Sequence, residues 1–206
     1  MKIKICGITN LKDAQDAVRL GADLLGFVFY PQSRRYLLPE NARKIIAQLP
    51  KQIKKAGVFV NESPARVRLI AEKCSLDILQ FHGKESNYYC QQFPGYKIIK
   101  AFRIKNARSL KSIPRFKVDL VLLDTYSSKS FGGTGKSFNW DLLKELKREN
   151  IRIMLSGGLN PKNISTAIKK VKPDAVDISS GVEISPGRKS RRLMKKLFEN
   201  ITKTNF

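Results

Sequence analysis

The 206-residue sequence has little histidine, little cysteine and no long apolar run. A single histidine, His82, cannot supply a site that needs two histidine ligands, such as the zinc site of paired histidines on one helix. Three cysteines without CxxC spacing argue against a disulfide framework and against a thiolate zinc site. No apolar run reaches the length of a membrane span, and the N-terminus lacks the apolar stretch of a signal peptide. A cytoplasmic location is therefore expected, with no membrane partner.

Acidic residues are also scarce, with 17 Asp and Glu against 40 Lys and Arg, which leaves a formal charge of +23. Such a charge raises nucleic acid as a partner, so a basic nucleic-acid-binding protein is one alternative. The basic residues are scattered along the chain, however, and the densest cluster, residues 188–196, has no aromatic side chains for base stacking. The interpretation favoured here is a lysine-rich surface without a specific nucleic-acid partner.

Eight short apolar runs alternate with amphipathic stretches. The runs read as continuous apolar segments, which is typical of strands buried on both faces of a parallel sheet. At about 25 residues per unit, eight units fill residues 1–206 and predict a single-domain (β/α)8 TIM barrel. A doubly wound open sheet shares the alternation and is the alternative. The strands are predicted at 3–6, 24–29, 56–60, 78–81, 98–102, 120–123, 151–155 and 175–178, and the helices at 11–20, 39–49, 64–74, 85–93, 106–113, 139–149, 161–171 and 189–201.

Polar residues that directly follow the apolar runs are candidates for chemistry, because active sites of such barrels lie at the carboxyl ends of the strands. Cys6 would lie at the rim in basic surroundings, which predicts a depressed thiol pKa and a base or nucleophile, although buried cysteines are usually inert. Asp124 follows three apolar residues, where a carboxyl group is costly unless it caps a loop or acts as an acid. His82, taken alone, is interpreted as a hydrogen-bonded core histidine.

Glycine-containing segments follow the last two predicted strands, at 156–160 and 179–183. Small residues there allow backbone N–H groups to approach an anion, and barrels often bind phosphate at this pair of loops. A third glycine-rich segment, at 132–137, invites comparison with a Walker A motif, but Ser130 stands where the first glycine is required. That segment is interpreted as a lid over the barrel mouth.

Eight segments together resemble the phosphoribosylanthranilate isomerases of tryptophan biosynthesis, in the order of that family and over residues 4–187. They are KICGIT at 4–9, GFVFYPQSRRY at 26–36, GVFVN at 57–61, LQFHG at 79–83, LLDT at 122–125, GGTGK at 132–136, LSGGLNP at 155–161 and DISSGVE at 177–183. The sequence departs from the family pattern at Ser190, where aspartate is common, and at Phe81, where leucine is usual. Serine can also cap a helix, so the first departure leaves the last helix intact.

The resemblance implies an Amadori rearrangement of N-(5-phosphoribosyl)anthranilate, a small anionic phosphosugar, to 1-(2-carboxyphenylamino)-1-deoxyribulose 5-phosphate, without metal or cofactor. It implies that Asp124 is the general acid on the furanose ring oxygen and that Cys6, as thiolate, is the general base at C2′. It further implies that Arg35 binds the anthranilate carboxylate. Substrate-side roles are implied for His82 and Asp177, and a phosphate grip for Gly157, Gly158, Ser180 and Gly181.

Other phosphosugar enzymes on the same barrel are the nearest alternatives. A metal-dependent pentose-phosphate epimerase would need more histidines than one. The related isomerase of histidine biosynthesis carries an aspartate at the end of its first strand, where this sequence has Cys6. The sequence leaves open whether the chain is a monomer or a homodimer.

Overall fold

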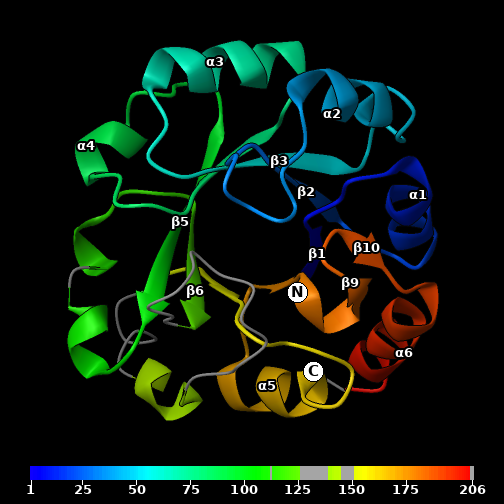
Figure 1. Cartoon of the computed structure of the whole chain (residues 1–206). Helices are drawn as coiled ribbons and strands as arrows, with labels where there is room; N and C mark the ends of the chain where they lie inside the picture. Colours follow the sequence, from blue (N-terminus) through cyan, green and yellow to red (C-terminus); the bar gives the residue numbers. More distant parts are fainter. Residues whose placement is uncertain (112, 126–138, 145–150, 205–206) are drawn as a thin grey trace.

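The structure is a computed structural model that describes residues 1–111, 113–125, 139–144 and 151–204. Eight parallel strands pair in sequence order, and β8 returns to pair with β1, so the sheet is a closed barrel. Figure 1 shows the helices arranged around the outside of the strands. The predicted (β/α)8 barrel is confirmed, and the doubly wound sheet is excluded because such a sheet does not close.

All eight predicted strands are present, with small changes at their ends. Most of these changes extend strands into polar residues, since inter-strand hydrogen bonds do not require apolar side chains. The strands are β1 (Lys2–Cys6), β2 (Leu24–Val28), β3 (Lys54–Phe59), β4 (Ile78–Phe81), β5 (Lys97–Ile104), β6 (Leu120–Thr125), β7 (Ile153–Leu155) and β8 (Ala175–Ile178).

Five helices agree with the sequence prediction in position, and side-chain caps explain where three of them, α1, α3 and α6, begin. Asn10 Oδ1 accepts a hydrogen bond from the backbone N–H of Asp13 at 2.8 Å, and Ser190 accepts one from the N–H of Leu193 at 3.3 Å. The serine that departs from the family pattern therefore does cap the last helix. These helices are α1 (Leu11–Arg19), α2 (Pro39–Ile46), α3 (Pro64–Lys73), α5 (Ile164–Val171) and α6 (Arg191–Thr202).

Three predicted helices are wrong in extent or type. The helix predicted at 85–93 is reduced to α4 (Asn87–Cys90), because the Glu85 carboxylate turns inward and Ser86 caps the helix after it. The segment 106–113 forms two short 3₁₀ turns, η1 (Ala107–Leu110) and η2 (Ile113–Arg115). Of the helix predicted at 139–149, residues Trp140–Lys144 form a 3₁₀ turn, η3, and the remainder lies outside the described residues.

The side chains inside the barrel change from apolar to polar along its axis. An apolar cluster from β2 to β8 fills one layer and includes Ile78, Leu122 and Ala175. Side chains two residues apart on a strand point to the same side, so the next inward positions are Gln80, Asp124 and Asp177. These three polar side chains are buried, and they mark the layer from which the site is built.

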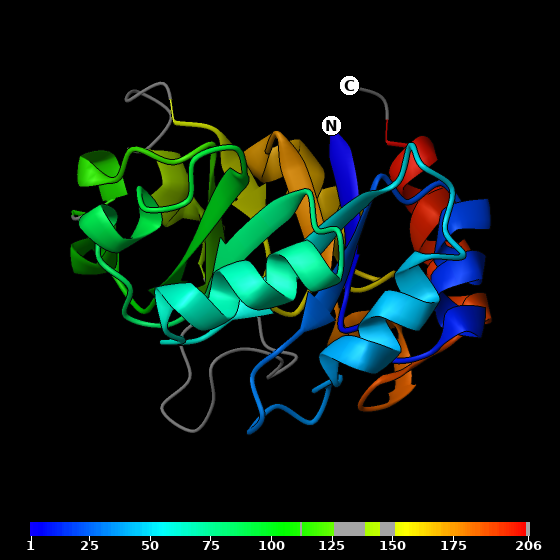
Figure 2. The ribbon, with the colours of Figure 1, turned by 90° about the horizontal axis from the view of Figure 1, so that it is seen from above.

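The carboxyl ends of the strands carry the segments that surround the site. After β8 the chain forms a short turn, η5 (Ser180–Val182), and an antiparallel hairpin of β9 (Glu183–Ser185) and β10 (Arg188–Lys189). Figure 2 shows this hairpin and the loop after β2 at the opposite end of the barrel from the N-terminus. None of the described helices combines the length and the apolar character that a membrane crossing requires.

Candidate active site

Cys6 is the last residue of β1, and its thiol is buried at the carboxyl end of the barrel. Burial raises the pKa of the Cys6 thiol, and the ammonium groups of Lys4 and Lys189 offset only part of that rise. The predicted depression of the thiol pKa is therefore wrong, because desolvation outweighs the positive charge. The two cations nevertheless provide partners for a thiolate once one forms.

Asp124 lies near the end of β6 and is buried beside His82, which follows β4. Asp124 Oδ1 accepts a hydrogen bond from the N–H of Thr125 at 2.8 Å, and Oδ2 lies 3.2 Å from Nε2 of His82. Nε2 of His82 and Oγ1 of Thr125 are buried, and neither has an aligned hydrogen-bond partner in the described part of the chain. Two unpaired polar atoms beside a buried carboxyl group are available to a ligand, and such atoms in a folded protein require an explanation.

A chain of polar contacts crosses the barrel from Asp177 to His82. Lys4 Nζ is fully buried and donates to Asp177 Oδ1 at 3.0 Å and to Gln80 Oε1 at 2.7 Å. Gln80 Nε2 in turn lies 3.2 Å from His82 Nδ1. Asp177, expected on the substrate side, is thus engaged by a lysine of the neighbouring strand β1.

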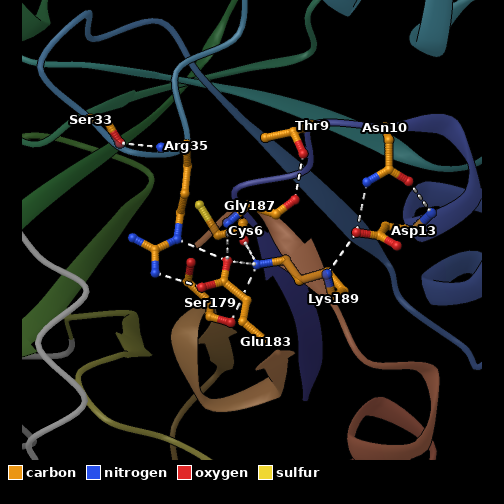
Figure 3. A network of polar contacts seen from close by, with 10 residues as sticks. All are labelled: Cys6, Thr9, Asn10, Asp13, Ser33, Arg35, Ser179, Glu183, Gly187 and Lys189. Atoms are coloured by element: carbon orange, nitrogen blue, oxygen red, sulfur yellow. Dashed lines mark hydrogen bonds and ion pairs between the residues drawn. The ribbon is translucent and has the colours of Figure 1, made fainter. Parts of the chain in front are cut away.

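Arg35, expected to bind a carboxylate, is held by a carboxylate of the chain itself. Its Nε and Nη2 donate to the two oxygens of Glu183 at 2.9 and 2.6 Å, which is a bidentate pair. Figure 3 shows the third guanidinium nitrogen directed away from Glu183. Glu183 therefore fixes the orientation of Arg35 and leaves one edge of the guanidinium for another partner.

Lys189, on β10, connects this pair to the end of β1 (Figure 3). Its buried Nζ donates to Glu183 Oε1 at 2.7 Å and to the carbonyl oxygens of Cys6 and Ser179 at 2.5 and 3.3 Å. Its backbone N–H donates to Asp13 Oδ2 at 2.7 Å. The hairpin after β8 is thereby fastened to the strand that carries the thiol.

The two predicted phosphate loops lie side by side between the thiol and the acid, since β7 and β8 separate β6 from β1 around the barrel. A Cβ atom on Gly181 would lie 1.9 Å from the carbonyl oxygen of Leu159, so the second loop fits against the first only without a side chain. Gly157 and Gly158 both have positive φ, 86° and 66°. The N–H groups of these three glycines donate to no described residue, which leaves them available to an anion.

The elements that follow the two loops determine which N–H groups can face an anion. No long helix begins directly after either loop, because α5 starts at Ile164 and the second loop continues into η5 and the β9–β10 hairpin. Ser180 and Gly181 are the first two residues of η5, so the N–H groups available to an anion belong to the first loop and to the start of this short turn. The glycine-rich segment 132–137, interpreted as a lid, lies outside the described residues.

Five residues of the site were missed by sequence reasoning. Three of them had a signal in the sequence, because a lysine or glutamine within an apolar strand has to be paired when the strand is buried. Partners such as Lys4 and Asp177, however, lie far apart along the chain, and only the fold brings them together. The five are Lys4, Gln80, Lys100, Glu183 and Lys189; Lys100 donates to Glu85 Oε2 at 2.8 Å.

Comparison with known proteins identifies the family. The family described as N-(5′-phosphoribosyl)anthranilate (PRA) isomerase matches residues 3–200. The N-(5′-phosphoribosyl)anthranilate isomerase of Citrifermentans bemidjiense is 48% identical over 202 residues, which cover 98% of this chain and 97% of that protein. The isomerase of Trichlorobacter lovleyi is 45% identical over 200 residues, with 97% of each chain covered.

Solved structures agree with the sequences. Phosphoribosyl anthranilate isomerase from Thermotoga maritima matches with a TM-score of 0.92 at 40% identity, over 98% of this chain and 99% of that chain. A phosphoribosyl anthranilate isomerase in complex with reduced 1-(o-carboxyphenylamino)-1-deoxyribulose 5-phosphate matches with a TM-score of 0.88, also at 40% identity and with the same coverage. The chain thus belongs to the N-(5′-phosphoribosyl)anthranilate isomerase family and is an isomerase built on a (β/α)8 barrel.

Proposed function

We propose that this chain converts N-(5-phosphoribosyl)anthranilate to 1-(2-carboxyphenylamino)-1-deoxyribulose 5-phosphate by an Amadori rearrangement, as a step of tryptophan biosynthesis. One observation carries the proposal. A buried thiol on β1 and a buried carboxyl group on β6 flank two loops in which the N–H groups of Gly157, Gly158 and Gly181 donate to no described residue. A family member described in complex with the reduced product adds support, since it relates the same barrel to this ligand.

Binding of the substrate would use its two anionic ends. The phosphate would accept hydrogen bonds from the N–H groups of Gly157, Gly158, Ser180 and Gly181. The anthranilate carboxylate would meet the free edge of the Arg35 guanidinium, which Glu183 holds in place. Both contacts are to groups that do not themselves react and would orient the sugar between thiol and acid.

The chemistry would consist of two proton transfers on the bound sugar. Asp124 gives a proton to the furanose ring oxygen, the C1′–O bond breaks, and the nitrogen lone pair forms an iminium ion. The Cys6 thiolate then removes the C2′ proton, and the electron pair of that C–H bond flows to the iminium nitrogen. The resulting enolamine tautomerises to the ketone. The proton gained by Cys6 balances the proton lost by Asp124, so the substrate and product differ by no proton.

Direct turnover of the proposed substrate tests this function. Purified protein should convert N-(5-phosphoribosyl)anthranilate, with loss of anthranilate-type fluorescence as the measurement. No turnover of this compound would contradict the proposal. Turnover of the corresponding aminoaldose of histidine biosynthesis, measured in parallel, would show whether a second substrate is accepted. Single-domain organisation over residues 1–206, a cytoplasmic location and a monomeric or homodimeric state stay predictions.

A further inference from the structure

A fully buried lysine constrains the orientation of the Gln80 amide. Lys4 Nζ has donors and no acceptor, so the atom that faces it at 2.7 Å has to be the oxygen of Gln80 and not its nitrogen. Its second contact, to Asp177 Oδ1 at 3.0 Å, anchors the ammonium group in this position. The opposite orientation of the amide would place NH₂ against NH₃⁺, two donors with no acceptor between them.

The amide orientation in turn decides which nitrogen of His82 carries the proton. With its oxygen on Lys4, Gln80 presents its NH₂ group to His82 Nδ1 at 3.2 Å. Nδ1 has to accept that hydrogen bond, so in the neutral ring the proton resides on Nε2. Nε2 is the atom that lies 3.2 Å from Asp124 Oδ2.

An Nε2–H group of His82 beside Asp124 favours the role of Asp124 as a general acid. When Asp124 gives up its proton, negative charge develops on the carboxylate, where Thr125 already donates to Oδ1 at 2.8 Å. A second donor at Oδ2 stabilises that charge as it forms. The Nε2 proton makes no aligned hydrogen bond to a described residue, so it is available to the nearby carboxylate or to a substrate oxygen.

We propose that Lys4 and Gln80 are positioning residues for the reaction: they hold His82 in the tautomer whose Nε2–H faces Asp124. The inference depends on the proposed function for its catalytic meaning, since Asp124 is taken as the general acid. The arrangement itself is a property of the folded protein and can be measured without substrate. It runs from Asp177 through Lys4 and Gln80 to His82.

The single histidine makes the experiment direct. Protein labelled with ¹⁵N in its histidine ring contains one imidazole, so a two-bond ¹H–¹⁵N correlation spectrum shows the tautomer of His82 alone. The expected spectrum of the unmodified protein at neutral pH has a protonated Nε2 and an unprotonated Nδ1. A protonated Nδ1 in that spectrum would overturn the inference, whatever the activity.

Two variants test the roles of the positioning residues. Gln80→Glu keeps an oxygen for Lys4 and places a second oxygen on His82 Nδ1, so Nδ1 should become protonated and kcat should fall roughly ten- to a hundredfold with little change in KM. Lys4→Met frees the amide to turn, and the ring should show both tautomers. An unchanged tautomer in a folded Gln80→Glu protein would contradict the proposal, even if Lys4→Met does not fold.

A matched control separates this effect from the loss of any paired lysine. Lys55→Met removes a mostly buried lysine that pairs with Asp77 at 2.7 Å, at the opposite end of the barrel, and should leave the spectrum of His82 unchanged. Failure of the two proposals can be told apart. Absence of turnover in the unmodified protein refutes the proposed function, whereas a wrong tautomer together with normal turnover refutes this inference alone.

Discussion

At the residue scale, the site is defined by the cost of burying charge. Lys4, Lys100 and Lys189 are each buried, and each has a carboxylate partner at 3.0 Å or less. Removal of one partner from a buried pair costs about 3–5 kcal/mol, because the other charge remains without compensation. These three lysines are therefore committed to internal contacts, and the charges of Lys4 and Lys189 also act on the Cys6 thiol.

The buried thiol makes activity depend on pH. Burial raises the pKa of Cys6 beyond its ordinary value of about 8.5, so at neutral pH the free protein holds the protonated thiol. We expect kcat/KM to increase with pH across the neutral range and past pH 8.5, since only the thiolate can remove the C2′ proton. Initial rates at low substrate concentration, measured from pH 6 to 10, check this. A plateau reached at or below pH 7 would contradict it.

Glu183 orients Arg35, and its ionisation makes the stability of the protein depend on pH. Although burial pushes the pKa of Glu183 upward, the hydrogen bonds and charges of Arg35 and Lys189 outweigh burial and hold it below the ordinary value. Glu183→Gln should lower the free energy of unfolding by about 2–4 kcal/mol at neutral pH and raise KM. Because the folded pKa is lowered, this stabilisation is lost as the pH falls through it, so the difference from the unmodified protein should shrink in acid.

Urea unfolding at pH 7 and at pH 3 measures both parts of that expectation. Glu62→Gln is the control, because Glu62 pairs with Arg66 at 3.4 Å near the surface and such a pair contributes about 0–1 kcal/mol. Equal effects of the two variants at pH 7 would show that the Arg35–Glu183–Lys189 contacts add nothing beyond an ordinary surface pair.

Sequence reasoning identified Cys6, Asp124 and the glycine loops because each follows an apolar strand, where parallel barrels gather their functional groups. It did not identify Lys4, Gln80 or Lys189. Lys4 contacts Gln80 from 76 residues away, and Lys189 contacts Cys6 from 183 residues away, so no local pattern connects these pairs. It also mistook the sign of the shift in the thiol pKa, because charge can be counted from a sequence whereas depth of burial cannot.

At the element scale, the strands were predictable and the short helices were not. Strands buried on both faces appear in the sequence as continuous apolar runs, and all eight were predicted. The helix predicted at 85–93 failed because a tertiary contact prevailed over local pattern. Glu85 accepts hydrogen bonds from the N–H groups of Asn61 and Gly83 at 2.7 and 2.9 Å, and this draws its backbone toward the barrel.

The contact between the loops after β7 and β8 predicts the effect of adding a single methyl group. Gly181→Ala would place Cβ 1.9 Å from the carbonyl oxygen of Leu159, so the two loops must move apart. We expect roughly tenfold weaker inhibition by inorganic phosphate and a higher KM. Gly95→Ala is the control, because its added Cβ meets nothing within 4 Å, although its φ of 88° is positive, whereas Gly181 is not among the glycines with positive φ. Unchanged phosphate inhibition in folded Gly181→Ala protein would refute the phosphate assignment.

At the scale of the whole molecule, the basic residues behind the formal charge of +23 fall into two groups, and the buried group has internal carboxylate partners that cancel its charge. A few lysines are buried within the barrel, as described, whereas others lie on exposed helix faces, such as Arg191, Arg192, Lys195 and Lys196 on α6. A positive field over the surface attracts small anions without providing a specific site for nucleic acid. The charge therefore suits capture of a substrate that carries both a phosphate and a carboxylate.

A higher salt concentration should slow the capture of the substrate. We expect kcat/KM to fall as the salt concentration rises from 0.05 to 0.5 M, roughly up to tenfold, because the Debye length shortens and screens the field. The value of kcat at saturating substrate should change much less, which serves as the internal control. A kcat/KM that stays constant over this range would contradict electrostatic steering.

The assignment of Cys6 as base and Asp124 as acid is tested most directly by turnover of N-(5-phosphoribosyl)anthranilate in two conservative variants. Cys90→Ser, a buried cysteine on α4, and Asp119→Asn, at the other end of β6, are the matched controls. The account predicts that kcat falls by about 10²–10⁴ in Cys6→Ser and in Asp124→Asn, with folding intact, and stays near the unmodified value in the controls. Retention of most of the activity in either Cys6→Ser or Asp124→Asn would contradict it.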